Sequence, residues 1–266
     1  MMVVEKEMLD SLILLKELYH IRGIKAEFEA EGASYQDMVR LRRLTLQAGI
    51  PFHVKIGGVE AVRDMRDCLE LGVDGIIAPM VESPFAVKKF IDAYFTVFGE
   101  KSHHIAINIE TKQAVAGLPD ILEVARGFVD AITIGRTDLS ASFFDPEITP
   151  DSEFIWQTVE DICQEAADHF TITLGGNVST STQEKLISHE TTRSRIAYVE
   201  TRKVIFPTEI FVYKTSSLAD ALLFEKLFIL AKKTTADTFL GPDLKRLAKL
   251  SERVKQATPE DYLMGV

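Results

Sequence analysis

Short apolar runs rich in β-branched residues alternate along the chain with longer segments in which apolar residues recur every three or four positions. The first pattern is typical of buried strands and the second of amphipathic helices. Strands are predicted at residues 24–29, 52–56, 75–78, 104–109, 131–134, 171–174 and 196–201. Helices are predicted between them at residues 35–47, 59–71, 83–98, 118–126, 154–169 and 181–189. This order predicts a series of βαβ units.

Further helices are predicted at both ends of the chain. One covers residues 5–19, and two cover residues 217–232 and 242–256, the last with Pro242 in its first turn. A (β/α)8 TIM barrel fits the whole order best, with an open doubly wound sheet as the alternative. Glycine and proline are scattered, and no repeat or linker is visible, so residues 1–266 are interpreted as a single barrel domain.

Composition narrows the possible partners and location. The formal charge of −10 argues against a nucleic-acid-binding surface, because such affinity depends largely on lysine and arginine. The apolar run at residues 12–15 is bracketed by charged side chains, so neither a signal peptide nor a membrane span is expected. Cys68 and Cys163 lie far apart without a metal-binding spacing. A cytoplasmic protein without membrane contact or a structural disulfide is therefore expected.

Two carboxylates stand at the ends of successive predicted strands. Glu110 follows the apolar run 104–109, and Asp138 follows the run 131–134 and Gly135. In a barrel of parallel strands, residues at these ends face the active site. A pair of carboxylates there would form a hard-oxygen cation site that a keto acid completes. Taken singly, Glu110 in a salt bridge and Asp138 as a helix cap are the simpler interpretations.

Several segments together resemble a known family. Residues 109–112 (IETK), 118–122 (LPDIL) and 134–140 (IGRTDLS), with 54–58 and 72–83 upstream, are similar to the HpcH/HpaI aldolase and citrate lyase family. That family belongs to the phosphoenolpyruvate/pyruvate barrel superfamily. The combination is more specific than any one segment, and the resemblance covers roughly residues 24–176.

The resemblance implies a lyase that depends on Mg²⁺ or Mn²⁺ and handles pyruvate or oxaloacetate as an enolate. By position, Glu110 and Asp138 match the metal ligands, and the backbone of the turn at Gly135, Arg136 and Thr137 matches the part that holds the substrate carboxylate. The chemistry is consistent, because a divalent ion acts as a Lewis acid toward the enolate oxygen. The partners implied are a small keto acid and an unidentified aldehyde or acyl acceptor.

Other positions match less closely. Lys55 stands where relatives carry an arginine that contacts the keto oxygen, and a salt bridge inside the barrel is its alternative role. Glu29 and Glu31 match acidic positions beside the active site, and in relatives the second helps to hold metal-bound water. We expect Lys55 and Glu31 to be catalytic, with a salt-bridge network as the alternative for the acidic cluster. Gly32 occupies the position of the family's catalytic histidine.

The architecture also departs from the family, which opens with a strand where this chain opens with a helix. Residues 210–214 would supply the missing strand, after a preceding strand within residues 196–206. Relatives often assemble through terminal helices, so a homo-oligomer is expected. Three interpretations of function remain: an aldolase-like lyase, a citrate-synthase-like or decarboxylating enzyme of the same superfamily, or a non-catalytic homologue that binds a keto acid.

Overall fold

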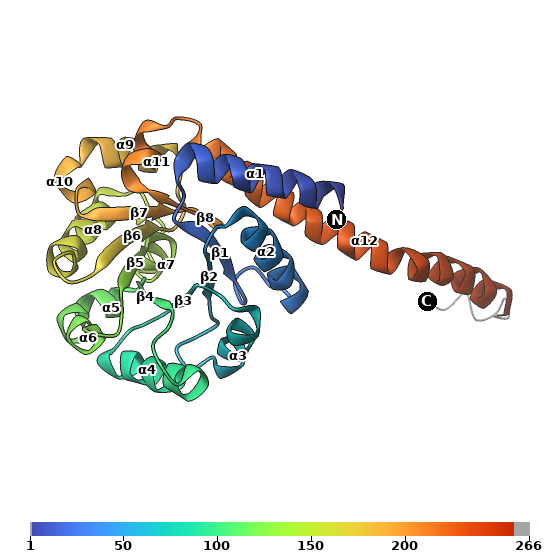
Figure 1. Ribbon diagram of the computed structural model, residues 1–266, viewed down its shortest axis with the longest axis horizontal. Helices are drawn as coiled ribbons and strands as arrows, with labels where there is room; N and C mark the ends of the chain where they lie inside the picture. The colour runs from blue at the N-terminus through green and yellow to red at the C-terminus, as the bar shows by residue number, and fades with distance from the viewer. Residues whose placement is uncertain (1, 258–266) are drawn as a thin grey trace.

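A computed structural model describes residues 2–257 of the chain. Eight strands close into a barrel in the order β1 to β8, and helices surround it (Figure 1). The strands are β1 Gly23–Glu27, β2 Phe52–Lys55, β3 Gly75–Ala78, β4 His104–Ile109, β5 Ala131–Gly135, β6 Thr171–Gly175, β7 Ile196–Glu200 and β8 Val204–Pro207. The helices are α1 Val3–Tyr19, α2 Tyr35–Ala48, α3 Val62–Leu71, α4 Pro84–Phe98, α5 Lys112–Ala116, α6 Leu118–Ala125, α7 Arg136–Ala141, α8 Glu153–Ala166, α9 Thr180–Ser188, α10 Glu190–Arg193, α11 Thr208–Tyr213 and α12 Ser217–Ala257.

The predicted TIM barrel is confirmed, and helices α2 and α4 begin directly after capping serines. The seven predicted strands and the six helices between them are all present, with bounds that differ by at most three residues. The Ser34 hydroxyl accepts a hydrogen bond from the Asp37 N–H (3.2 Å) before α2, and Ser83 accepts one from Ala86 (3.2 Å) before α4. Such caps satisfy backbone donors that have no partner within the helix.

The strands divide their side chains between two faces of the barrel. In β4, Ile105, Ile107 and Ile109 join the main hydrophobic core between strands and helices, whereas Asn108 lines a cavity inside the barrel. Ala106 belongs to a small apolar cluster of its own with Ile77 and Ala131. Because side chains alternate along a strand, one face of each strand stabilises the barrel and the other is free to carry polar groups.

The eighth strand departs from the expected topology. β7 and β8 pair in antiparallel fashion through a turn at residues 201–203, and β8 then pairs with β1, again antiparallel. Residues 196–206 therefore form most of a hairpin rather than one strand. The prediction of a strand at residues 210–214 is wrong, because residues 208–213 form α11. A tight turn is enough to connect β7 to β8, because antiparallel strands need no helical crossover between them.

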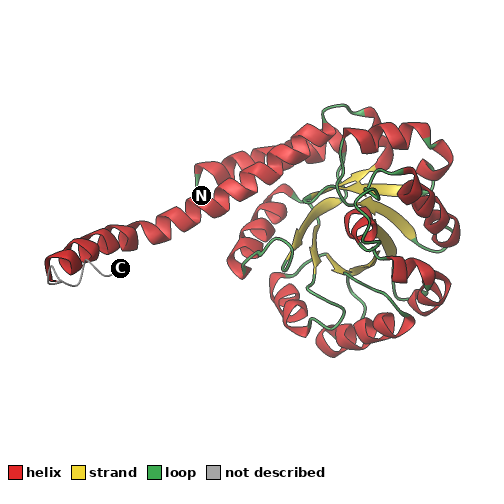
Figure 2. Cartoon of the chain, turned by 180° about the vertical axis from the view of Figure 1, so that it is seen from behind, coloured by secondary structure: helices red, strands yellow, loops and turns green. Residues whose placement is uncertain are grey.

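The two ends of the chain lie side by side. α1 is confirmed and packs along the first half of α12, and the Tyr19 hydroxyl bonds to Ser216 (2.7 Å) and Asp220. The two predicted C-terminal helices are in fact one continuous helix that includes Pro242. Its second half runs out from the ring of strands and helices (Figure 2). Within residues 2–257, no helix is both long and apolar enough to cross a membrane.

Candidate functional site

A cavity of about 360 Å³ opens at the carboxyl ends of the parallel strands. It is lined by residues at or just after the ends of β1, β2, β4, β5, β6 and β7, and by α12. Of the residues singled out in the sequence, it brings together Lys55, Glu110, Gly135, Thr137 and Asp138. The side chains of Arg136 and Glu31 lie elsewhere, as described below.

Glu110 is held in place by backbone and side-chain donors. Its Oε1 accepts the N–H of Met80 (2.8 Å), and its Oε2 accepts the Nδ2 of Asn108 (3.0 Å). Met80 takes the left-handed φ of 53°, a strained conformation for this residue type that aims its N–H at the carboxylate. A Cβ at Gly135 would lie 2.6 Å from Glu110 Oε2, so glycine is required beside it.

The electrostatics around Glu110 favour a cation. Burial raises the pKa of Glu110, and the neighbouring Asp138 adds to the rise, although Met80, Lys55 and Asn108 partly offset it. The cavity lining holds five carboxylates against three cationic side chains, a formal charge of −2. A carboxylate that is buried beside another carboxylate is stabilised most by a nearby positive ion.

The side-chain oxygen atoms that line the cavity fit a hard divalent cation whose remaining ligands come from outside the protein. Asn108 Oδ1 is buried and has no hydrogen-bond partner within residues 2–257. It lines the same cavity as Glu110 and Asp138, and carboxylate and amide oxygens are the ligands that Mg²⁺ and Mn²⁺ prefer. The described residues contain no group of three or more His, Cys, Asp or Glu that could hold a metal. Substrate or water oxygens would therefore have to supply the remaining ligands.

A chain of ion pairs lines the same cavity. Lys55 contacts Glu27 (3.0 Å), Glu27 contacts Lys25 (3.3 Å), and Lys25 contacts Glu200 (2.6 Å). Burial lowers the pKa of Lys25, but Glu200 and Glu27 outweigh it and raise that pKa above its usual value. Burial raises the pKa of Glu27, yet the two lysines more than reverse this and hold it low. Lys25 and Glu27 therefore stay ionised near neutral pH.

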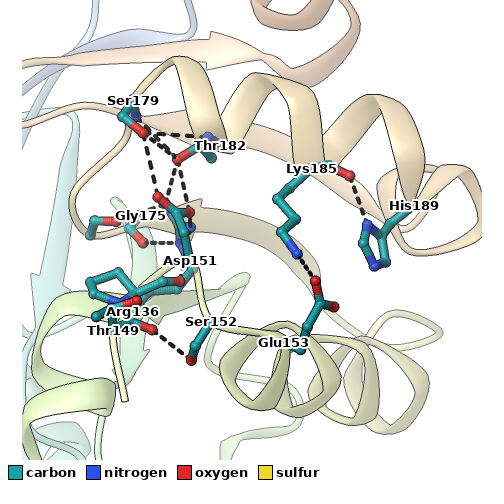
Figure 3. Close-up of polar contacts among 12 residues, drawn as sticks. Arg136, Thr149, Asp151, Ser152, Glu153, Gly175, Ser179, Thr182, Lys185 and His189 are labelled. Atoms are coloured by element: carbon teal, nitrogen blue, oxygen red, sulfur yellow. Dashed lines mark hydrogen bonds and ion pairs between the residues drawn. The ribbon is translucent and has the colours of Figure 1, made fainter. Parts of the chain in front are cut away.

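The side chain of Arg136 is buried next to the cavity and does not line it. Its buried guanidinium donates to the carbonyls of Gly175 (3.2 Å) and Gly176 (2.8 Å) and to Asp151 (2.6 Å), as Figure 3 shows for Gly175 and Asp151. The backbone of Arg136 and Thr137 packs against Gly176. A Cβ at Gly176 would lie 2.6 Å from the backbone nitrogen of Arg136 and 2.5 Å from that of Thr137. Glycine at this position therefore leaves room for the turn at the cavity.

The acidic cluster after β1 separates in space. Glu27 alone faces into the barrel, because the strand ends there. Glu29 approaches Gly57 on the loop before α3, and the buried Glu31 pairs with Lys203 without lining the cavity. Gly32 adopts a φ of 51°, a left-handed conformation that disfavours other residue types. A histidine at this position would be strained in the observed loop.

Sequence reasoning did not single out Asn108 as a site residue. The signal was present, because Asn108 stands two positions before Glu110 and alternation along β4 puts both on the inner face. Arg202, Leu222 and Glu225 also line the cavity mouth. Of these, Leu222 and Glu225 had no local signal, because their place depends on how α12 crosses the barrel.

Comparisons with known proteins identify a family and solved structures with the same fold. The family model of HpcH/HpaI aldolase/citrate lyase matches residues 48–182. No curated protein sequence matches the chain. Among solved structures, the HpcH/HpaI aldolase from Desulfitobacterium hafniense DCB-2 has 16% identity and a TM-score of 0.57 over 73% of this chain and 82% of its own.

Two further solved structures share the fold. The citrate synthase SbnG has 18% identity and a TM-score of 0.56 over 82% of this chain and 90% of its own. An HpcH/HpaI aldolase/citrate lyase family protein from Burkholderia cenocepacia J2315 has 10% identity and a TM-score of 0.57 over 81% and 90%. At these identities the likeness concerns the fold, and the family match rests on residues 48–182.

Proposed function

The chain belongs to the HpcH/HpaI aldolase/citrate lyase family, and on this premise we propose that it is a divalent-metal-dependent carbon–carbon lyase that acts on a 2-keto acid. Pyruvate and oxaloacetate are the proposed donors, and an aldehyde or acyl compound is the second partner. The main support is that Glu110, Asp138 and Asn108 line one cavity with Lys55, and that Asn108 Oδ1 has no hydrogen-bond partner within residues 2–257.

Each part of the cavity has a proposed role. Glu110 and Asp138 would hold Mg²⁺ or Mn²⁺, with Asn108 Oδ1 beside them, and the bound ion would supply Lewis-acid stabilisation of negative charge on the substrate. The backbone of the turn at Gly135, Arg136 and Thr137 would hold the substrate carboxylate. The guanidinium of Arg136 would act by positioning this turn, because it is buried against Gly175, Gly176 and Asp151.

Lys55 would stabilise the enolate through its charge. In the synthetic direction, a proton passes from carbon 3 of the keto acid to solvent water, and the electron pair of that C–H bond moves toward the keto oxygen. The keto C=O then re-forms as carbon 3 bonds to the carbonyl carbon of the acceptor, whose oxygen takes up a proton from water. The Lys55 ammonium, which contacts Glu27 at 3.0 Å, would favour the state in which oxygen carries negative charge. Glu27 is a weak base, because its pKa is held low.

Glu31 has an indirect role in this scheme. Its ion pair with Lys203 ties the loop after β1 to the β7–β8 turn, and Lys232 of α12 donates to the Glu31 carbonyl (3.2 Å). The loop that follows Glu27 is thereby fixed at the cavity rim. We propose that Glu31 contributes to catalysis by holding this loop rather than by contacting the donor.

Exchange of the pyruvate methyl protons with deuterated water tests the donor chemistry alone. Proton NMR should show exchange with Mn²⁺ or Mg²⁺ and the wild-type protein. Glu110→Gln and Asp138→Asn should reduce the rate at least about 100-fold, because each removes a charged ligand and with it transition-state stabilisation. Glu123→Gln, an exposed carboxylate on α6, is the matched control.

The outcomes separate the three interpretations. Exchange that depends on both carboxylates supports the lyase. Release of CO2 from oxaloacetate without pyruvate exchange would favour a decarboxylating enzyme, and condensation of oxaloacetate with an acyl donor would favour the citrate-synthase-like alternative. Metal and keto-acid binding without any of these reactions would leave a non-catalytic binding protein and overturn the proposal.

A further inference from the structure

A second, smaller cavity lies inside the barrel at the amino ends of the strands. Its volume of about 20 Å³ is enough for at least one water, since one water needs about 10–15 Å³. The lining of this lower cavity includes Arg22, His53, His104, Thr133, Tyr198 and Glu200. Three of these side chains, Arg22, His104 and Tyr198, are only partly buried, so the lower cavity reaches solvent at this end of the barrel.

One nitrogen in the lower cavity has no partner inside the protein. His53 Nε2 is buried and makes no hydrogen bond within residues 2–257. Burial lowers the pKa of His53 to about 3, so the ring is neutral and Nε2 can either donate or accept one hydrogen bond. Buried waters typically bond to polar groups of this kind. The lower cavity has room for the water that would satisfy this nitrogen.

A β-bulge turns two further polar side chains into the barrel. The pairing of β6 with β7 shifts register after Ile196, so Ala197 is an extra residue in β7. Ile196 and Val199 consequently both join the outer core, although they are three positions apart. Without the extra residue, alternation from Ile196 would point Tyr198 outward. The bulge therefore puts Tyr198 and Glu200 on the inner face, where both line the lower cavity.

The lower cavity shares a wall with the upper cavity, which holds the two candidate metal-ligand carboxylates. Thr133 and Glu200 line both cavities, and both residues are buried. Ile77, Ala106 and Ala131 form an apolar part of the lower lining. A hydroxyl can donate and accept at the same time, and a carboxylate can take up and release a proton. The shared wall thus carries the two kinds of group that pass protons between waters.

Building on the proposed function, we propose that protons pass between the upper cavity and solvent through the lower cavity, with Glu200 as the relay. The proton that leaves carbon 3 of the keto acid passes to water in the upper cavity and then to the Glu200 carboxylate. Glu200 gives a proton to water in the lower cavity, which restores the carboxylate, and the Thr133 hydroxyl bridges the waters on the two sides. The reverse sequence returns a proton. This path stays open while bound substrates fill the upper cavity.

Exchange of the pyruvate methyl protons with deuterated water measures this path. A proton that leaves carbon 3 and returns to it produces no exchange, so slower escape to solvent lowers the observed rate. With Mg²⁺ present, Ala131→Val should fill the lower cavity and lower the rate about tenfold or more, as expected for the loss of a proton-transfer step. Thr133→Val, which removes the shared hydroxyl at nearly constant shape, should do the same. Glu200→Gln should also lower the rate, because an amide cannot carry the proton.

A small base should reverse these losses. Imidazole enters the upper cavity through its own mouth, so rising imidazole should restore exchange in the variants and leave the wild-type rate nearly unchanged. A variant that had only lost its structure would not recover. Calorimetry should show equal Mn²⁺ binding by Ala131→Val and wild type, because Ala131 does not line the upper cavity. Ala125→Val, the same change at a buried position of α6, is the matched control and should keep the wild-type rate.

A crystal structure tests the lower cavity without turnover. We expect an ordered water within hydrogen-bond distance of His53 Nε2 in the wild-type protein, and its loss in Ala131→Val. Absence of this water, or equal exchange rates in wild type and all three variants, would overturn the proton path and leave the proposed lyase. Binding of Mg²⁺ and pyruvate by the wild-type protein without any exchange would instead overturn the lyase, and the proton path with it.

Discussion

His53 lies inside the barrel on β2, next to two strands that carry glycine opposite its ring. A Cβ at Gly75 would lie 2.1 Å from His53 Nδ1, and one at Gly23 would lie 2.6 Å from its Cδ2. Burial lowers the pKa of His53 to about 3, with further lowering by His104 and Arg22 and a small opposing effect of Asp74. The Nε2 atom has no hydrogen-bond partner within the described chain. The folded protein thus holds a neutral imidazole.

This histidine predicts a pH dependence of stability. In the unfolded chain its pKa is near 6.5, so as the pH falls from about 6.5 to about 3 only the unfolded state takes up the proton. The free energy of unfolding should fall by about 1.4 kcal/mol per pH unit from this residue alone. Urea unfolding at pH 7, 6, 5 and 4 should show a shallower decline for His53→Gln than for wild type. Equal slopes would contradict the assignment.

At the scale of elements, the short helix α7 carries Asp138 and depends on Arg136 for its position. The guanidinium joins α7 to the end of β6 and, through Asp151, to the loop before α8 (Figure 3). Arg136→Met should destabilise the fold by about 3–5 kcal/mol, since it leaves Asp151 and two carbonyls without their buried cation. It should also weaken Mn²⁺ binding. Chemical unfolding and a calorimetric Mn²⁺ titration would measure both effects.

Figure 3 also contains the control for this prediction. Lys185 pairs with the largely exposed Glu153, so Lys185→Met should change stability by less than about 1 kcal/mol and leave Mn²⁺ binding unaltered. The double variant Arg136→Met with Asp151→Leu should recover part of the stability, because no unpaired carboxylate remains. Equal losses for Arg136→Met and Lys185→Met would show that Arg136 does not hold α7.

Local pattern was enough to predict most elements and to place Glu110 and Asp138 at the ends of successive strands, where they line one cavity. It failed where contacts between distant parts of the chain determine the structure. The run of residues 210–213, Ile-Phe-Val-Tyr, has strand-like composition yet lies in α11, so tertiary packing overrides propensity there. The β7–β8 turn, Thr201-Arg202-Lys203, lacks the glycine or asparagine that marks a hairpin. Pro242 suggested a new helix start, but α12 continues through it. The outward path of Glu31 likewise follows from Lys203, 172 positions away.

At the scale of the whole molecule, the second half of α12 runs out from the barrel (Figure 1). Leu240, Leu244, Leu247 and Leu250 follow each other at three- and four-residue spacing and are all exposed. Residues 243–257 hold five cationic and two acidic side chains, a charge of +3 in a chain of −10. The remainder of the chain therefore carries −13 and is electrostatically complementary to this segment.

We expect this segment to join copies of the chain into a homo-oligomer, because an apolar stripe flanked by positive charge matches an acidic partner surface. Light scattering coupled to gel filtration should show an oligomer for wild type and a monomer for the variant with Leu244→Glu and Leu247→Glu. Lys249→Glu with Arg253→Glu should weaken association, as should raised salt. Ile187→Glu, an exposed apolar position on α9, is the control and should leave the oligomer intact. A monomeric wild-type protein whose α12 binds anionic vesicles would contradict self-association, since the same apolar stripe and positive charges would then serve a membrane surface.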